Sequence, residues 1–227
     1  TTLDANQTLT DTTIGSANYD VGHVFHRGGG GGVAGAIGNV AVNGQKAKGF
    51  SSRSTIVGDA FTIDYVAHEL GHQFAGRHTF NNCSGDQGDS STLAIEPTSG
   101  STIMAYAGIC SSNLQNASDA MFHSINIEQI RSYITSTTVN NAATRTSTGN
   151  SIPTVSGGSD FTIPDQTPFL LTAVGSDANA DSLTYVWEQR NGGAAVAAGS
   201  STSTTGPLFR AHVPTSSPVR SFPRLSS

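Results

Sequence analysis

The chain has 227 residues, of which 12% are charged, and its 11 Lys and Arg against 16 Asp and Glu give a formal net charge of −5. This balance excludes a nucleic-acid-binding protein, which needs a basic face. No apolar run reaches the length of a membrane span, so we expect one large domain or two modest ones that do not cross a membrane.

The first part of the chain offers few regular patterns. Residues 1–18 are polar and show no clear periodicity, whereas residues 19–25 (YDVGHVF) alternate enough to predict a strand. Five glycines at 28–32 precede the small apolar run 33–40, and a flexible linker is one interpretation of these glycines. Residues 46–54 (KAKGFSSRS) indicate a basic surface loop with solvated lysines.

The most informative pattern is His68-Glu69-x-x-His72, followed by His78. Residues four apart lie on one face of a helix, so His68 and His72 can place two imidazole nitrogens on one Zn²⁺. Glu69 then lies beside the metal, where a carboxylate can take a proton from a water molecule that the metal activates. A turn can bring His78 round as a third ligand, and three protein ligands leave one position open, as in catalytic zinc sites.

Residues 101–106 (STIMAY) add a second signal downstream. With this segment the chain resembles the metzincin metalloproteases, in which H-E-x-x-H-x-x-G-x-x-H is followed by a Met-turn. Within that clan it is most similar to the bacterial reprolysin-like secreted proteases, over roughly residues 10–135. The resemblance implies a zinc-dependent endopeptidase in which Met104 forms an apolar floor beneath the metal.

The resemblance also implies a strand that binds substrate. Metzincins hold the substrate antiparallel to an edge strand beside the zinc, and a free strand edge can pair with an extended peptide. We place this strand at residues 30–38, because small residues let a peptide approach closely. The candidate substrate-binding residues are Gly30, Gly31, Gly32, Val33, Ala34 and Gly35.

Two positions need separate comment. Tyr106 follows Met104 at the spacing where astacin-like and serralysin-like metzincins carry a tyrosine that ligates zinc or lies over it, so the candidate catalytic residues are Glu69 and Tyr106. The alternative is a tyrosine packed against the turn. Ala75 stands where the clan pattern has Gly, and we expect Gly76 to make the turn instead, since Gly accepts positive φ at little cost.

Two helices are expected around the site. The active-site helix is expected to be capped by Asp59 or Thr62, and residues 119–135 predict a second helix capped by Ser124 or Asn126. Apolar residues near helical spacing give each helix a face to bury. They are Phe61, Tyr65, Val66, Leu70 and Phe74 in the first helix, and Ile127, Ile130 and Ile134 in the second.

Two cysteines and three carboxylates surround the Met-turn segment. Cys83 and Cys110 are expected to form a disulfide, which for a loop of this size stabilises by roughly 3 kcal/mol; two free buried thiols are the alternative. Asp86, Asp89 and Glu96 offer oxygen ligands of the kind that Ca²⁺ takes, without an EF-hand-like spacing. We favour a solvated acidic loop.

The last third of the chain has a different character. Residues 141–151 lack periodicity and indicate a linker. Residues 152–227 contain short apolar runs divided by turns, which predicts an all-β sandwich with Trp187 as its core aromatic residue. The stretch 177–187 is similar to bacterial Ig-like or cadherin-like modules, some of which bind Ca²⁺ through such aspartates; we favour a plain turn here.

The expected fold is an α+β metzincin catalytic domain at 1–140, a linker at 141–151 and a partial all-β sandwich at 152–227. We expect the N-terminal part of the catalytic domain and part of the sandwich to be missing. Because Thr1 opens a polar stretch without a signal peptide, we expect a mature form or a fragment of a secreted bacterial protein.

The predicted function is hydrolysis of peptide bonds in extracellular proteins, by a monomer that holds one Zn²⁺ through His68, His72 and His78. Its partners would be protein or peptide substrates. The alternative is a catalytically decayed protease fold that serves in binding or adhesion, and the retained Glu69 argues against it.

Overall fold

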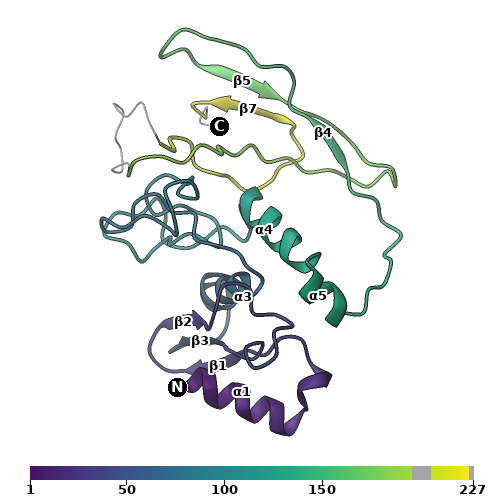
Figure 1. The fold of residues 1–227 in the computed structure, drawn as a ribbon. Coiled ribbons are helices and arrows are strands. Elements are labelled where there is room, and N and C mark those ends of the chain that lie inside the picture. The colour runs from purple at the N-terminus through teal and green to yellow at the C-terminus, as the bar shows by residue number, and fades with distance from the viewer. Residues whose placement is uncertain (196–205, 225–227) are drawn as a thin grey trace.

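The computed structural model describes residues 1–195 and 206–224, and its fold is mixed α and β with small sheets (Figure 1). The elements are α1 (Thr2–Thr13), the short 3₁₀-helix η1 (Ser16–Asn18), β1 (Val24–Arg27), β2 (Gly31–Ala34), β3 (Gly49–Arg53), α2 (Asp59–Phe61), the π-helix η2 (Thr62–Ala67), α3 (His68–Gln73), α4 (Ser124–Ile134), α5 (Thr137–Ala142), β4 (Thr154–Ser156), β5 (Phe169–Thr172), β6 (Val174–Ser176) and β7 (Val219–Phe222). No helix in the described part of the chain is both long and apolar enough to span a membrane.

The three-stranded sheet next to the active-site helix has the strand order β1-β3-β2. Strand β3 pairs parallel with β1 and antiparallel with β2, with Gly31 opposite Ser52 and Ala34 opposite Gly49. The sheet lies between α1 and α3 (Figure 1). The strand predicted at 30–38 is therefore present, in shorter form, and β2 lies at an edge of the sheet.

Strand β3 lies where a basic surface loop was predicted, so that prediction was wrong. Ser51 and Ser52 are buried at the centre of the sheet. Lys46 is not solvated either: it is 4% exposed, its Nζ donates to the Ser16 carbonyl, and it lies 4.5 Å from the centre of the Tyr19 ring. The segment lacks apolar alternation because small polar residues fill this part of the core.

Helix α1 occupies the polar segment for which the sequence predicted no structure. A capping box begins it, in which Thr1 and Asp4 exchange hydrogen bonds. Lys48 forms an ion pair with Asp4 at 3.0 Å, and the buried Gln7 accepts a hydrogen bond from the Ala47 N–H at 2.8 Å. Polar contacts to the segment before β3 therefore hold this helix in place.

The active-site helix is fixed to the sheet mainly by hydrogen bonds. Gln73 is fully buried, and its amide donates to the Gly22 carbonyl and to Asn39 Oδ1, both at 3.2 Å. Its Oε1 lies 2.7 Å from His23 Nδ1. A Cβ atom at Gly49 would lie 2.2 Å from the same oxygen, so β3 needs glycine at that position.

Two details of this helix differ from the prediction. Its N-terminal cap is Gly58, without a side-chain cap, so neither Asp59 nor Thr62 serves. Only Phe61 of the predicted apolar face is buried, because the buried residues of α3 are those of the motif.

The predicted second helix is confirmed as α4. Its cap is His123, whose Nδ1 accepts from the Ile125 N–H at 3.3 Å, so the assignment of the cap to Ser124 or Asn126 was wrong. Helix α5 follows and ends within the predicted linker.

The C-terminal part contains two small antiparallel sheets, β4–β6 and β5–β7. Phe222 is buried there and stacks on Phe169, with ring centres 4.8 Å apart. Trp187 is half-buried, and its Nε1 donates to the Pro218 carbonyl at 3.0 Å, so the core aromatic residue is Phe222 rather than Trp187.

The turn at Asp177 is confirmed, since its carboxylate accepts from two following backbone N–H groups. Of the module expected at 152–227, residues 196–205 and 225–227 lie outside the described residues.

Candidate metal centre and active site

Three histidines converge from α3 and the turn that follows it: His68 begins the helix, His72 lies in its last turn and His78 follows it. His78 Nε2 lies 3.2 Å from His68 Nε2 and 3.0 Å from His72 Nε2. His68 and His72 are buried, and the His78 side chain is 18% exposed. Among the described residues these three form the only His, Cys, Asp and Glu group compact enough to hold a metal ion.

The other nitrogen of each ring faces a hydrogen-bond acceptor. His68 Nδ1 lies 2.7 Å from the Ile103 carbonyl, His72 Nδ1 lies 2.8 Å from the Gly76 carbonyl, and His78 Nδ1 lies 3.1 Å from Asp89 Oδ1. These acceptors assign the proton of each neutral ring to Nδ1. Each Nε2 is then a bare lone pair facing two others, an arrangement that is favourable only around a cation, and Zn²⁺ fits three imidazole ligands.

Burial keeps the His68 and His72 rings neutral, as metal ligation requires. It lowers the pKa of His68 to about 3 and that of His72 to about 4, with the neighbouring histidines adding to both shifts. The charge of Asp89 acts in the opposite direction and favours the protonated form of His68 and His72. Its hydrogen bond with His78 holds the pKa of the Asp89 carboxyl below its usual value.

The acidic segment before the turn at Met104 is a solvated loop only in part. Asp89 also accepts from the His78 backbone N–H at 3.1 Å, so it orients the third histidine. Glu96 is 1% exposed, whereas Asp86 and Asp89 are exposed residues. The sequence prediction missed Asp89 and Glu96 because nothing in their spacing indicates these partners. Since both carboxylates are engaged in this way, the segment lends no support to a calcium site.

Glu96 joins residues 101–102, just before Met104, to Thr79 after His78. Its Oε1 accepts from the backbone N–H groups of Ser101 and Thr102, at 3.0 and 3.1 Å. Its Oε2 accepts from the hydroxyls of Thr79 and Thr102, both at 2.6 Å. The carboxylate thus connects Thr79, which follows His78, to the turn whose Ile103 carbonyl orients His68.

Glu69 lies between the helix and the edge strand. Burial raises the pKa of its carboxyl to about 7, although a hydrogen bond from the Ala34 backbone favours the charged form. A Cβ atom at Gly32 would lie 2.5 Å from Glu69 Oε1. Glycine at this position of β2 is thus required for the carboxylate to reach its place.

The turn after the helix departs from the sequence prediction. Ala75 itself takes the left-handed conformation, with φ of 72°, so the expectation that Gly76 makes the turn was wrong. Gly76 is needed for a different reason. Its N–H donates to the Gly71 carbonyl at 2.7 Å, and a Cβ atom at Gly76 would lie 2.9 Å from that oxygen.

Met104 is fully buried in a tight turn against α3. A Cβ atom at Gly71, between the two helical histidines, would lie 2.4 Å from the Met104 sulfur. The thioether therefore lies directly against the backbone of the ligand-bearing turn.

Tyr106 lines a cleft of about 500 Å³ together with His68 and Glu69. Its ring stacks on Phe80, with centres 4.5 Å apart, and lies 4.6 Å from the His78 ring. Burial and the nearby carboxylates raise the pKa of its phenol. Within the described residues its hydroxyl makes no hydrogen bond, so the ring is packed while the hydroxyl is available to a ligand.

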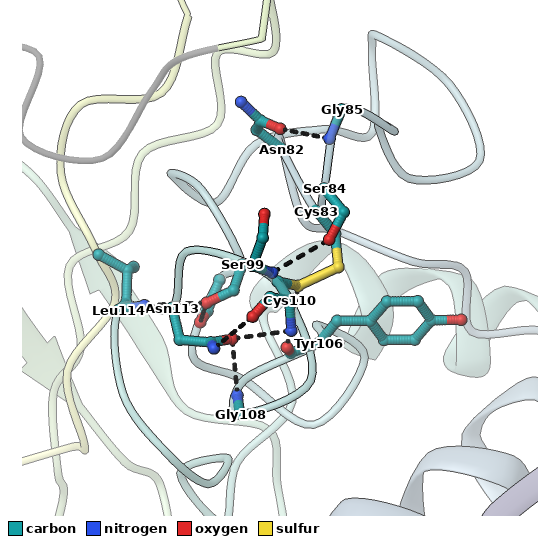
Figure 2. The surroundings of a disulfide bond; sticks show 12 residues. Asn82, Cys83, Ser84, Gly85, Ser99, Tyr106, Gly108, Cys110, Asn113 and Leu114 are labelled. Carbon is teal, nitrogen blue, oxygen red and sulfur yellow. Dashed lines mark hydrogen bonds between the residues drawn. A yellow bond between two sulfur atoms is a disulfide. The ribbon is translucent and has the colours of Figure 1, made fainter.

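The wall of this cleft beyond Tyr106 is covalently fastened. Cys83 and Cys110 form the predicted disulfide, and the Cys110 sulfur also contacts the Tyr106 carbonyl at 3.2 Å. Figure 2 shows the disulfide joining two loops, with the Tyr106 ring extending away from it. The disulfide thus ties the loop after His78 to the turn that carries Tyr106.

The six candidate substrate-binding residues divide into two groups. Gly30, Gly31 and Gly32 line the cleft. Val33 is 45% exposed outside it, and the Gly35 N–H is taken by the Lys48 carbonyl at 2.7 Å. Ala34 contributes its backbone N–H to Glu69. The cleft also contains residues that the sequence prediction did not name, among them Arg53 and Asp64.

Comparison with known proteins gives one match. The model of a family described as metallo-peptidase family M12B, reprolysin-like, matches residues 2–137, more than half of the chain. No curated protein and no solved structure matches the chain.

Proposed function

Because the chain belongs to the reprolysin-like family of metallopeptidases, we propose that it is a zinc-dependent endopeptidase with His68, His72 and His78 as the metal ligands. The observation that carries this proposal is the convergence of three Nε2 atoms whose rings are all oriented by acceptors at Nδ1. When bound, zinc supplies the Lewis acid that polarises the scissile carbonyl and makes water a stronger acid.

The remaining steps belong to residues of the chain. Glu69 accepts the proton of the attacking water and then delivers it to the leaving amine, a role that suits a carboxyl whose pKa is raised to about 7. The free edge of β2 pairs with an extended peptide and holds it across the cleft. Tyr106 donates a hydrogen bond to the oxygen of the scissile carbonyl as negative charge develops there.

Further parts of the proposal concern the whole protein. We propose that it acts outside the cell on extracellular proteins, because a disulfide persists in oxidising compartments. We also propose a monomer with a bacterial origin, a catalytic domain at 1–140, a linker at 141–151 and an Ig-like module at 152–227. Met104 would serve as the Met-turn floor of the metal site.

Metal content and peptide cleavage test the proposal together. The purified chain should hold one Zn²⁺ and cleave casein, and a chelator should remove both properties. Glu69→Gln should keep zinc and abolish turnover, because an amide cannot accept the proton. His78→Ala should bind zinc far more weakly.

Two results would overturn the assignment. A wild-type chain that binds zinc stoichiometrically yet cleaves no protein or peptide would favour the decayed binding protein. Near wild-type turnover by Glu69→Gln would exclude Glu69 as the base.

A further inference from the structure

Arg53 is the last residue of β3, and its side chain lines the catalytic cleft. The residue is half-buried, and its guanidinium carbon lies 5.8 Å from the centre of the Tyr65 ring. Within residues 1–195 and 206–224, this guanidinium forms no ion pair and no side-chain hydrogen bond. A partly desolvated, always-charged group in a cleft is favourable when a ligand supplies the opposite charge.

The nearby charges are arranged differently. Arg27 lies opposite Arg53 in the pairing of β1 with β3, but it is exposed and its Nε donates to the Ser54 carbonyl at 3.2 Å. Asp64 also lines the cleft, and its Oδ1 accepts from the Ser118 backbone N–H at 2.8 Å. Arg53 thus differs from Asp64 and Arg27, because its charged group has neither an ion pair nor a hydrogen bond among the described residues.

Positions along the edge strand β2 give the distance between Arg53 and the peptide bond that would be cleaved. Glu69 packs against Gly32, whereas Arg53 lies past the pair Gly31–Ser52 and lines the cleft with Gly30. Gly30 and Gly32 are two residues apart, which in a strand is about 7 Å. A peptide paired along this edge would place a side chain near Arg53 about two residues from the bond next to Glu69.

We propose that Arg53 is a specificity-determining residue that selects peptides with an Asp or Glu side chain about two residues from the scissile bond. The inference rests on the proposed endopeptidase function and names its substrate class. A guanidinium binds a carboxylate through two parallel hydrogen bonds. A Gln side chain in the peptide cannot replace the carboxylate in this pair, because its amide has only one oxygen, and a Lys ammonium cannot replace the planar guanidinium.

Cleavage-site mapping tests this preference directly. The zinc-loaded chain is incubated with a mixed peptide library, and mass spectrometry identifies the residues within about three positions of each cut. Asp and Glu should be enriched at one position. Quenched fluorescent peptides that differ only by Glu, Gln or Lys at that position should then show about tenfold higher kcat/KM for Glu than for Gln.

Two matched variants assign the preference to one residue. Arg53→Gln should reduce the Glu-to-Gln ratio to about one, whereas Arg27→Gln, which changes the neighbouring arginine outside the cleft, should keep it. A binding measurement serves as an independent readout: fluorescence anisotropy with the Glu69→Gln protein should show tighter binding of the Glu peptide than of the Gln peptide. Adding Arg53→Gln to that protein should remove the difference.

The outcomes separate this inference from the proposed function. Cleavage without any enrichment of acidic residues, or with a preference for Lys directed by Asp64, overturns the role of Arg53 and leaves the peptidase intact. A preference for Glu that survives Arg53→Gln also overturns it. If nothing is cleaved and no peptide binds, both proposals fail.

Discussion

Each imidazole of the candidate metal site is oriented by an acceptor from a different part of the chain. His72 uses the Gly76 carbonyl of its own turn, His68 uses the Ile103 carbonyl, and His78 uses Asp89. Such outer contacts fix the ring and its tautomer, and their loss commonly weakens metal binding 10- to 100-fold. The orientation of His68 and His78 therefore depends on two loops that lie outside the motif.

Tyr106 is the residue whose hydroxyl can be tested alone. Tyr106→Phe keeps the ring that stacks on Phe80 and removes a donor that has no partner within the described residues. We expect kcat to fall by about 10- to 100-fold while KM and the free energy of unfolding change little, the pattern of a contact made only in the transition state. Steady-state kinetics and urea unfolding check this; an unchanged kcat would make Tyr106 a packing residue.

Glu96 gives a second prediction, on stability and metal binding. Glu96→Ala leaves the buried N–H groups of Ser101 and Thr102 without an acceptor, so the free energy of unfolding should fall by about 2–5 kcal/mol. Glu96→Gln should lose less, because its carbonyl can accept from both N–H groups while the threonine hydroxyls rotate to accept from its amide.

The control for Glu96 is another acid of the same segment. Asp86 is exposed, so Asp86→Ala should stay within about 0.5 kcal/mol of wild type. Urea unfolding and zinc competition with a chelator measure both effects. Equal losses in Glu96→Ala and Asp86→Ala would show that Glu96 does not hold residues 101–102 in place.

At the scale of elements, the turn after α3 contains a strained position next to a crowded one. Ala75 has φ of 72°, a conformation that costs an L-residue about 1–2 kcal/mol. Glycine would avoid this cost, but its greater backbone entropy in the unfolded chain would offset part of the gain. Ala75→Gly should therefore stabilise by about 0.5–1 kcal/mol. Gly76→Ala should destabilise, because its Cβ would meet the Gly71 carbonyl. Urea midpoints that move in the same direction for both variants would contradict this account.

Some of these elements could be predicted from the sequence and others could not. The histidine motif, the edge strand and α4 were predicted because their signals are local: helical spacing, small residues and regular isoleucines. Strand β3 and helix α1 were not, since they are held by Ser51, Gln7 and other polar residues whose partners lie far along the chain. Asp89 and Glu96 were misjudged for the same reason, because a carboxylate in a loop is identified only by what it contacts.

At the scale of the whole molecule, Glu188, Arg190 and Arg210 bind the segment around the start of α4. Glu188 accepts from the Ser124 N–H at the start of α4, at 2.7 Å, and Arg190 holds Glu128 through two hydrogen bonds of 2.9 and 2.8 Å. Arg210 forms an ion pair with Asp119 at 3.1 Å. These contacts hold the residues around Asp119, Ser124 and Glu128 against the C-terminal part of the chain.

Buried histidines make the stability of the metal-free protein depend on pH. The folded chain has a pKa of about 3 for His68 and about 4 for His72, against an ordinary value of 6.5. As the pH falls below about 6.5, the unfolded chain takes up these protons first, so the stability present above that pH is lost progressively towards pH 4. With about 1.4 kcal/mol for each pKa unit, each ring should contribute a loss of about 2 kcal/mol between pH 7 and pH 5.

Urea unfolding in the presence of a chelator at several pH values measures this loss. The His72→Gln variant is the matched control, because its amide takes up no proton, and its metal-free form should lose less stability over the same range. Bound zinc should shift the loss to lower pH, since metal and protons compete for the same nitrogens and the metal binds only the folded chain. Because the raised pKa of Glu69 gives a gain of stability over the same pH range, the two proteins must be compared. A His72→Gln protein that loses as much stability as the wild type between pH 7 and pH 5 would show that the His72 ring is not buried in the neutral form.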